Sequence, residues 1–297
     1  MRNNLKNKKP VKITVQASCA DLAGQAQDVA ARLGLPIEPP ECSSVHRVRS
    51  TEQNNRLLLR VSVNGLELVK PDDPKLRGAV RVDFTAGHAA YRRRQQKKEL
   101  LVRAVGGKGG KGGASLNVID ATGGLGRDSF LLAAAGYRVS IFERQPVIAA
   151  LLADGLARVA AHPETAEISQ RIRLTVGDAV PALEAMQETG AGEKGKDYED
   201  GEGVDVVYLD PMFPERRKSA LVKKELQLLQ LLAQPDFAPE KLLAAALKAA
   251  AQRVVVKRPL KAPFLTDCSP SHSLTGKTVR FDVYLGCLLS RNREYSG

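Results

Sequence analysis

The segment from Asp210 to Pro214, with the sequence Asp-Pro-Met-Phe-Pro, contains the residue types best suited to chemistry on a nucleobase. An exocyclic amine is a poor nucleophile because its lone pair is delocalised into the ring. An enzyme can help by accepting hydrogen bonds from the NH2 group and by aligning the nitrogen with the group to be transferred. Asp210 and the Pro211 carbonyl are suitable acceptors, and Phe213 can stack on a base, which is worth about 1–3 kcal/mol. The alternative is a turn stiffened by its prolines after a buried strand. We predict a catalytic segment made of Asp210, Pro211, Met212 and Phe213.

A glycine-rich turn lies earlier in the chain, at residues 120–126, with the sequence DATGGLG. Glycines allow a backbone to turn tightly and to approach a ligand closely. The dinucleotide fingerprint G-x-G-x-x-G is only half met, because Ser129 occupies the position of its third glycine. S-adenosylmethionine (SAM) has no pyrophosphate and needs the turn without the full phosphate cradle. An ordinary strand-to-helix turn is the alternative. We predict cofactor contacts from Asp120, Gly123, Gly124 and Gly126.

Acidic residues follow the next two strand-like segments. Glu143 comes about 20 residues after the glycines, where a carboxylate can accept hydrogen bonds from both hydroxyl groups of a ribose. A solvated glutamate at a strand end is the alternative, and the preceding glycine turn favours the ribose interpretation. Asp178 can accept a hydrogen bond from an adenine amino group, or it can cap the following helix, and both roles can hold together.

These residues must be positioned by the elements that precede them. From about residue 116 onward, apolar strand-like segments alternate with helical ones, which favours an α/β fold with a mostly parallel sheet and helices on both faces. In such sheets ligands bind at the carboxyl ends of the strands. The expected strands are 117–121, 138–142, 172–176, 204–209, 253–257 and 279–285.

Three regions are expected along the chain. Residues 1–80 are predicted to form a small α+β domain with a hairpin, because Asn64-Gly65 suits a tight turn between two apolar runs. Residues 81–115 are basic and glycine-rich and are predicted to be a connector. Residues 116–297 are predicted to form the domain that carries the site.

The composition restricts the partners and the compartment. The formal net charge of +12 favours a polyanionic partner such as RNA, and clusters such as Lys257-Arg258 suit a nucleic-acid backbone. Four cysteines without C-x-x-C pairing and four histidines without ligand spacing argue against a metal site. The first ten residues have no apolar core of a signal peptide, and no apolar run is long enough to span a membrane. We therefore expect a cytoplasmic protein with no metal and no membrane association.

Four motifs together resemble one family. They are DATGGLGRD at 120–128, FER at 142–144, LDPMFP at 209–214 and KSALVKKE at 218–225. The chain resembles the RsmJ family of bacterial small-subunit ribosomal RNA guanine-N2 methyltransferases from about residue 80 to 265. The resemblance implies a class I methyltransferase (Rossmann-like) fold with a seven-stranded sheet, and methyl transfer from SAM to one guanine near the 3′ end of 16S rRNA, leaving S-adenosylhomocysteine.

The resemblance also implies site residues and partners. Cofactor contacts carry over to Arg127, Asp128, Glu143, Arg144, Asp178, Ala179 and Asp210. The partner is 16S rRNA or the 30S subunit, and we expect a monomer. Tyr91 stands where the family usually has a histidine. Two alternatives remain open: a DNA adenine-N6 methyltransferase, because loops like Asp210–Pro214 also serve that chemistry, and a non-catalytic ribosome assembly factor that binds rRNA.

Overall fold

The computed structural model describes residues 11–41, 56–76, 78–106, 115–188, 203–211, 224–232, 238–250 and 252–285. They form two compact units. One contains the residues up to Val82 together with helix α8 (Lys224–Leu232), and the other contains the remaining residues from Asp83 onward. Every described residue that the sequence assigned to the site lies in the second unit.

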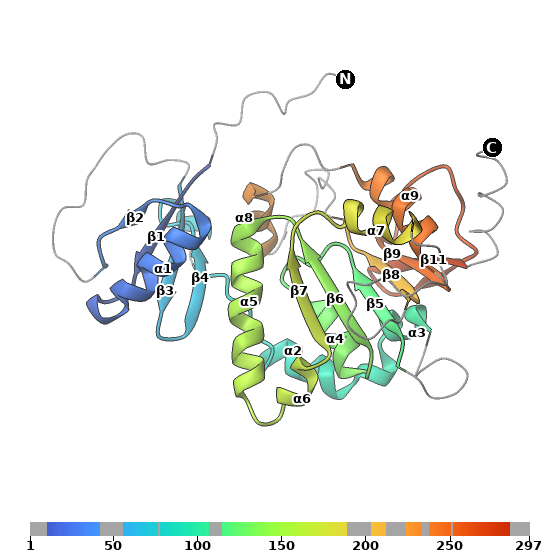
Figure 1. Ribbon diagram of the computed structural model, residues 1–297, viewed down its shortest axis with the longest axis horizontal. Helices are drawn as coiled ribbons and strands as arrows, with labels where there is room; N and C mark the ends of the chain where they lie inside the picture. Colours follow the sequence, from blue (N-terminus) through green and yellow to red (C-terminus); the bar gives the residue numbers. More distant parts are fainter. Residues whose placement is uncertain are drawn as a thin grey trace, which may run out of the picture. The chain divides into compact units, whose positions relative to one another are not determined.

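A seven-stranded sheet forms the centre of the second unit (Figure 1). Its strand order is β10-β11-β9-β8-β5-β6-β7, and all neighbours pair in parallel except β11, which is antiparallel to β9 and to β10. The chain moves from β5 to β6 on one side and later returns to β8 on the other side, so the strand order reverses at β5. Ligands of open α/β sheets bind in the crevice at such a switch point. The expected seven-stranded, mostly parallel α/β fold is confirmed. The strands are β5 (Asn117–Asp120), β6 (Arg138–Glu143), β7 (Ile172–Val176), β8 (Val206–Leu209), β9 (Arg253–Pro259), β10 (His272–Thr275) and β11 (Val279–Leu285).

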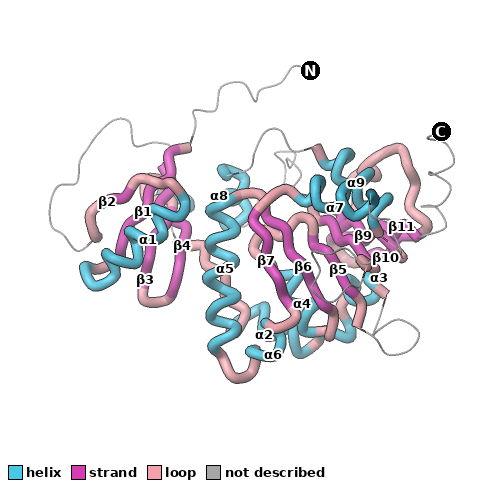
Figure 2. The backbone as a smooth tube through the Cα atoms, viewed as in Figure 1, coloured by secondary structure: helices cyan, strands magenta, loops and turns pink. Residues whose placement is uncertain are grey.

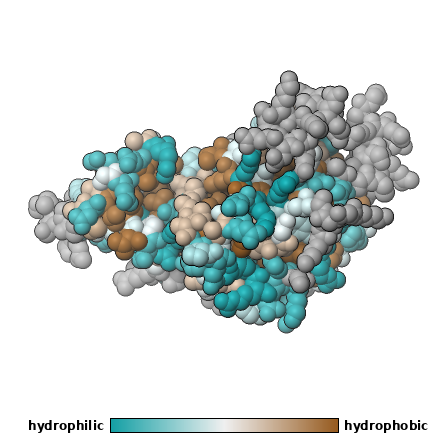
Figure 3. Space-filling view, turned by 60° about the horizontal axis from the view of Figure 1, so that its bottom comes forward, coloured by the Kyte–Doolittle hydropathy of each residue, from teal (hydrophilic) through white to brown (hydrophobic). Residues whose placement is uncertain are grey.

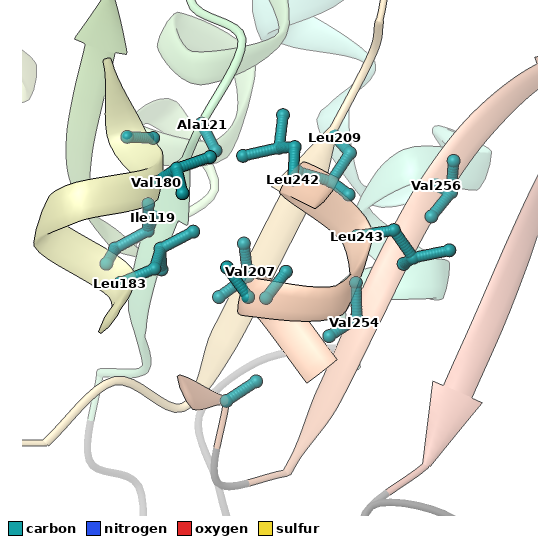
Figure 4. Packing of buried hydrophobic residues seen from close by; sticks show 14 of the residues in the cluster. Ile119, Ala121, Val180, Leu183, Val207, Leu209, Leu242, Leu243, Val254 and Val256 are labelled. Carbon is teal, nitrogen blue, oxygen red and sulfur yellow. The ribbon is translucent and has the colours of Figure 1, made fainter. Parts of the chain in front are cut away.

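Helices cover both faces of this sheet (Figure 2). On one face, Val207 of β8 and Val254 of β9 pack in an aliphatic cluster with α7 (Ala179–Glu188) and α9 (Pro239–Ala249) (Figure 4). Successive side chains of a strand point to opposite faces. Tyr208 therefore points to the other face, where its hydroxyl group contacts α4 (Arg127–Ala134) through Asp128. Helices α5 (Pro146–Ala161) and α6 (Ala166–Ser169) also belong to this unit.

Part of the segment expected to be a connector is folded. Residues 83–106 belong to the second unit and contain α2 (Gly87–Arg94) and α3 (Leu100–Val105), with a short 3-10 turn at Gln96–Lys98 between them. Four of the six residues of α3 are buried, namely Leu101, Val102, Ala104 and Val105. The basic residues around these helices obscured that apolar pattern in the sequence. Residues 107–114, which hold most of the Gly-Lys run, lie outside the described part of the chain.

The first unit contains a four-stranded sheet in the order β2-β1-β3-β4. Strand β1 pairs in parallel with β2 and with β3, and helix α1 packs against β1. Strands β3 and β4 form the expected hairpin, but Ser62 pairs with Gly65, so the two turn residues are Val63 and Asn64 rather than Asn64 and Gly65. The elements are β1 (Lys12–Ala17), a 3-10 turn (Ala20–Leu22), α1 (Ala23–Leu33), β2 (Ile37–Glu38), β3 (Arg56–Ser62), β4 (Gly65–Val69) and a second 3-10 turn (Pro74–Leu76).

Some apolar side chains reach the surface. Hydrophobic patches lie among hydrophilic ones in the space-filling view (Figure 3). Val176, at the end of the edge strand β7, is 61% exposed. Among the described residues, no helix is both long and apolar enough to cross a membrane.

Candidate cofactor and active site

The turn after β5 is held against the neighbouring strand by close backbone packing. The Gly123 N–H donates to the Phe142 carbonyl oxygen at 2.9 Å, and a Cβ atom at Gly123 would lie 2.4 Å from a methyl group of Ile141. Gly126 immediately precedes α4 and has a φ of +69°, and a Cβ atom there would lie 2.5 Å from Leu152 Cδ1. Both positions therefore require glycine. Gly124, in contrast, faces open space, because the nearest atom to a Cβ there would be the Thr122 carbonyl oxygen at 3.8 Å.

Asp120 is buried beneath the glycine turn and forms hydrogen bonds with it and with α4. Its side chain is buried and accepts hydrogen bonds from the Thr122 N–H at 3.0 Å and from the Ser129 hydroxyl group. Burial raises the pKa of Asp120 to about 7, although the two hydrogen bonds act in the opposite direction. These contacts indicate that Asp120 fixes the backbone of the turn at Thr122, and that Ser129 fixes the Asp120 carboxylate in turn.

Glu143, the last residue of β6, is joined to the same turn. One carboxylate oxygen accepts from the Gly124 N–H at 2.7 Å, and the other accepts from the Gln145 N–H at 2.7 Å. Burial raises the pKa of Glu143, and the two backbone donors together with Arg144 oppose that shift. A carboxylate oxygen can accept a second hydrogen bond. The Glu143 carboxylate is therefore fixed in orientation, and its oxygens can still accept hydrogen bonds from the hydroxyl groups of a ribose.

The remaining cofactor candidates follow the carboxyl ends of β5, β6 and β7. The Gly177 N–H donates to the Glu143 carbonyl oxygen at 2.9 Å, which links the end of β7 to the end of β6. Asp178 is exposed and accepts from the Val180 N–H at 2.9 Å, so the capping role proposed for it is present. Ala179 is buried at the start of α7, Arg127 is exposed at the start of α4, and Arg144 is half-buried.

Asp210 follows β8 and lies beside the glycine turn. Its backbone N–H donates to the Thr122 hydroxyl oxygen at 2.6 Å, so the turn after β5 fixes the backbone at the end of β8. One carboxylate oxygen, Oδ2, accepts from Lys257 at 2.8 Å. Within the described part of the chain, the other oxygen accepts no hydrogen bond, and 41% of the side chain is exposed. Pro211 is described and buried, whereas Met212 and Phe213 lie outside the described residues.

A network of charges connects Asp210 to α4. Lys257 Nζ lies 2.8 Å from Asp210 Oδ2 and 2.7 Å from Asp128 Oδ2. Asp128 also accepts from the Tyr208 hydroxyl group at 2.8 Å and from Arg92 at 2.9 Å. Arg92 in turn donates to Glu99 at 3.0 Å. Three acidic side chains, Asp210, Asp128 and Glu99, thus alternate with two basic ones, Lys257 and Arg92, and Tyr208 joins the network at Asp128.

The charges in this network support one another. Burial disfavours a charged Asp128, but Lys257 and Arg92 outweigh it and hold the pKa of Asp128 well below its usual value. Burial likewise opposes a charged Lys257, and the two carboxylates outweigh it and raise the pKa of this amine. The pKa of Asp210 lies above its usual value, because burial and the nearby Asp128 outweigh Lys257. Lys257 is therefore the group that favours the carboxylate form of Asp210.

Two assignments made from the sequence need correction. Lys257 and Arg258 were expected to contact a nucleic-acid backbone. Lys257 instead forms ion pairs with Asp128 and Asp210, and Arg258 is buried and donates to the Pro263 carbonyl oxygen at 2.7 Å. Strand parity could have located Lys257, because Val254 and Val256 face the aliphatic cluster and Lys257 must face the side of α4. Thr122, Tyr208 and Arg92 were missed because their roles depend on contacts between distant segments.

The fold and this site define a class I SAM-dependent methyltransferase. The family model described as "Putative SAM-dependent methyltransferase" matches residues 43–286. The ribosomal RNA small subunit methyltransferase J of Aeromonas salmonicida is 47% identical over 261 residues, which cover 86% of this chain and 98% of that protein. The protein of the same name from Pseudomonas aeruginosa strain UCBPP-PA14 is 42% identical over 277 residues and covers 92% and 94%.

A solved structure of a SAM-dependent methyltransferase is also similar to this chain in sequence and in fold. The crystal structure of a SAM-dependent methyltransferase from Neisseria gonorrhoeae is 32% identical, has a TM-score of 0.63, and covers 92% of this chain and 96% of that chain. The chain belongs to the ribosomal RNA small subunit methyltransferase J family.

Proposed function

We propose that this protein transfers the methyl group of SAM to the exocyclic N2 amine of a guanine in small-subunit ribosomal RNA. The observation that carries the proposal is the position of Asp210. Its second carboxylate oxygen accepts no hydrogen bond within the described residues, although the Thr122 hydroxyl group and Lys257 fix the residue itself. An acceptor held in this way can orient an amino group and localise its lone pair, which supplies much of the rate.

The residues around the glycine turn fit the cofactor. Glu143 can accept the ribose hydroxyl groups, and the open space at Gly124 lets a ligand approach the backbone. Asp178 retains an exposed carboxylate beside its helix cap, which suits an adenine amino group. Bound SAM would supply an electrophilic methyl group on its sulfonium. As the new N–C bond formed, the electrons of the C–S bond would stay on sulfur, which leaves S-adenosylhomocysteine, and the methylated amine would release its extra proton to water.

The proposed substrate follows from charge and from the relatives. The net charge of +12 favours RNA, and exposed basic residues of the second unit include Arg94, Lys98, Arg103 and Arg127. The similar proteins of Aeromonas and Pseudomonas are named for methylation of small-subunit ribosomal RNA. We place the target near the 3′ end of 16S rRNA, as the motif resemblance implies, and expect a cytoplasmic monomer that needs no metal.

Methyl transfer from tritiated SAM tests this function. We expect label in 16S rRNA or 30S subunits from cells that lack the gene, no label in DNA, and loss of label with Asp210→Ala. Digestion of the product should give N2-methylguanosine from a single site. Labelled N6-methyladenine in DNA would instead favour the DNA enzyme. Tight RNA binding with no transfer to rRNA or DNA would favour the assembly factor.

A further inference from the structure

Lys257 contacts two carboxylates at once, that of Asp210 and that of Asp128. Lys257 follows the buried segment Val254–Val256 and points to the face covered by α4. Its amine lies within 2.8 Å of one oxygen of Asp210 and within 2.7 Å of one oxygen of Asp128. Its side chain is only 25% exposed. A lysine amine has three N–H donors, and a carboxylate on either side directs two of them.

Asp128 is the fixed end of this contact. Its carboxylate accepts from Arg92, Tyr208 and Lys257 at distances between 2.7 and 2.9 Å, and its side chain is 12% exposed. Arg92 is itself held by Glu99 at 3.0 Å. Three protein donors from different elements thus occupy the Asp128 carboxylate. Oδ2 accepts two of these bonds and Oδ1 accepts the third, so the carboxylate is held on both sides and is well placed to anchor Lys257.

Asp210 is the end that meets the substrate, and it needs such an anchor. Its backbone is fixed by Thr122, but a side chain that is 41% exposed could otherwise rotate. The bond from Lys257 to Oδ2 fixes the rotation and leaves Oδ1 as the acceptor within the described residues. Without the lysine, two carboxylates would face each other, which favours protonation of one of them. A protonated Asp210 would be a poorer acceptor for an amine.

We propose that Lys257 is a positioning residue: anchored by Asp128, it orients the Asp210 carboxylate and keeps it ionised for the target amine. This inference rests on the proposed function, because it assumes that Asp210 meets the amine. It assigns Asp128 an indirect role through Lys257. Nothing in this arrangement requires Lys257 to touch SAM or RNA.

The test replaces Lys257 by methionine, which keeps the length of the stem and removes the charge. We expect kcat to fall about 100-fold, as for other small misplacements of a reacting group. The Kd for SAM, measured by calorimetry, should change less than about threefold, because only orientation at the transition state is lost. The acidic limb of the pH profile of kcat should move up by roughly one unit or more, because Asp210 loses its cation. Lys248→Met, at an exposed position on α9, is the matched control and should keep the kcat and pH profile of the wild type.

A second variant keeps the test decisive if Lys257→Met does not fold. Lys257→Gln retains a neutral donor, so we expect a smaller loss of kcat and the same direction of shift in the pH profile. An unchanged kcat in either folded variant would overturn the positioning role, and so would a loss of SAM affinity as large as the loss of kcat. Absence of methyl transfer by the wild type to any rRNA substrate would refute the proposed function instead.

Discussion

Replacing Gly126 by alanine is expected to lower the free energy of unfolding of the second unit by about 2–5 kcal/mol. Two costs add. A φ of +69° is unfavourable for a residue with a Cβ atom, by about 1–2 kcal/mol. The new methyl group would also lie 2.5 Å from Leu152 Cδ1 and 3.4 Å from Phe84 Cζ. Overpacking of this kind costs about 1–3 kcal/mol.

Leu152 has little freedom to relieve this clash, because its side chain is completely buried. Phe84, on the other side, stacks on Phe130 with ring centroids 4.5 Å apart. Close-packed interiors transmit such strain to their neighbours. The added methyl group should therefore disturb the packing of α4 and α5 together rather than a single side chain.

Gly124→Ala is the matched control for this prediction. Its φ of +53° imposes a similar backbone cost of about 1–2 kcal/mol, but no atom lies within 3.4 Å of the new methyl group. Urea unfolding should show a clearly larger loss for Gly126→Ala than for Gly124→Ala. SAM binding at a temperature where both are folded should show the reverse order, because the Gly124 methyl group enters the open space of the proposed cofactor site. Equal losses of stability would refute the packing argument.

Three further predictions concern single residues. Glu143→Gln should weaken SAM binding by about 10- to 100-fold in calorimetry, because a hydrogen bond to a charged group is worth about 1.5–3 kcal/mol; unchanged affinity would contradict the ribose role. Asp120→Asn should gain stability relative to the wild type as the pH rises from 4 to 7 in urea titrations. The pKa of Asp120 is about 7 in the folded state and 3.8 in the unfolded state, so the wild type loses the stability that this group contributes as the pH rises from about 4 to about 7, whereas the variant does not. A stability difference that is independent of pH would contradict the raised pKa. Leu183→Ala, at a completely buried position of the aliphatic cluster, should cost about 2–5 kcal/mol by the same measurement, and a loss below about 1 kcal/mol would mean that the cluster can collapse around the site.

The central strands of the second unit's sheet were predictable because apolar residues lie on both of their faces. Strand β8 and residues Val254–Val256 of β9 are continuous apolar runs, and six of the seven strands were expected at nearly the observed positions. Strand β10 was missed because His272–Thr275 is mostly exposed and has neither an apolar run nor an alternation. It is visible only as the antiparallel partner of β11.

The first unit was less predictable, because its pairings are not local. The hairpin of β3 and β4 has a turn signal in the sequence. The parallel pairing of β1 with β3 joins segments about 40 residues apart and has no such signal. The observed turn, at Val63 and Asn64, also lies one residue before the turn predicted at Asn64 and Gly65.

Some residues of the site could be predicted from their own place along the chain, whereas others depend on contacts between distant segments. The positions of Glu143 and Asp210 could be predicted, because Glu143 ends one parallel strand and Asp210 follows another, at the carboxyl ends of the strands where ligands bind. Lys257 lies near the carboxyl end of another parallel strand, β9, yet its charge alone suggested a surface role. Its partners depend on two facts that the sequence does not state: β9 lies next to β8, and Asp128 lies on the same face.

The contacts of Lys257 also explain how an interior strand can carry a charged residue near its carboxyl end. Burying one charge without a partner is costly, and removing one member of a buried pair leaves the other uncompensated. Here β9 pairs with β8, so that the residue after Val256 comes beside the residue after Leu209, and the two side chains of opposite charge meet. Asp128 adds a second carboxylate from α4, and Arg92 adds a second cation. The strand order that creates the crevice therefore also pairs the charges at its edge, and a neutral residue at 257 would leave two adjacent carboxylates with only Arg92 to compensate them.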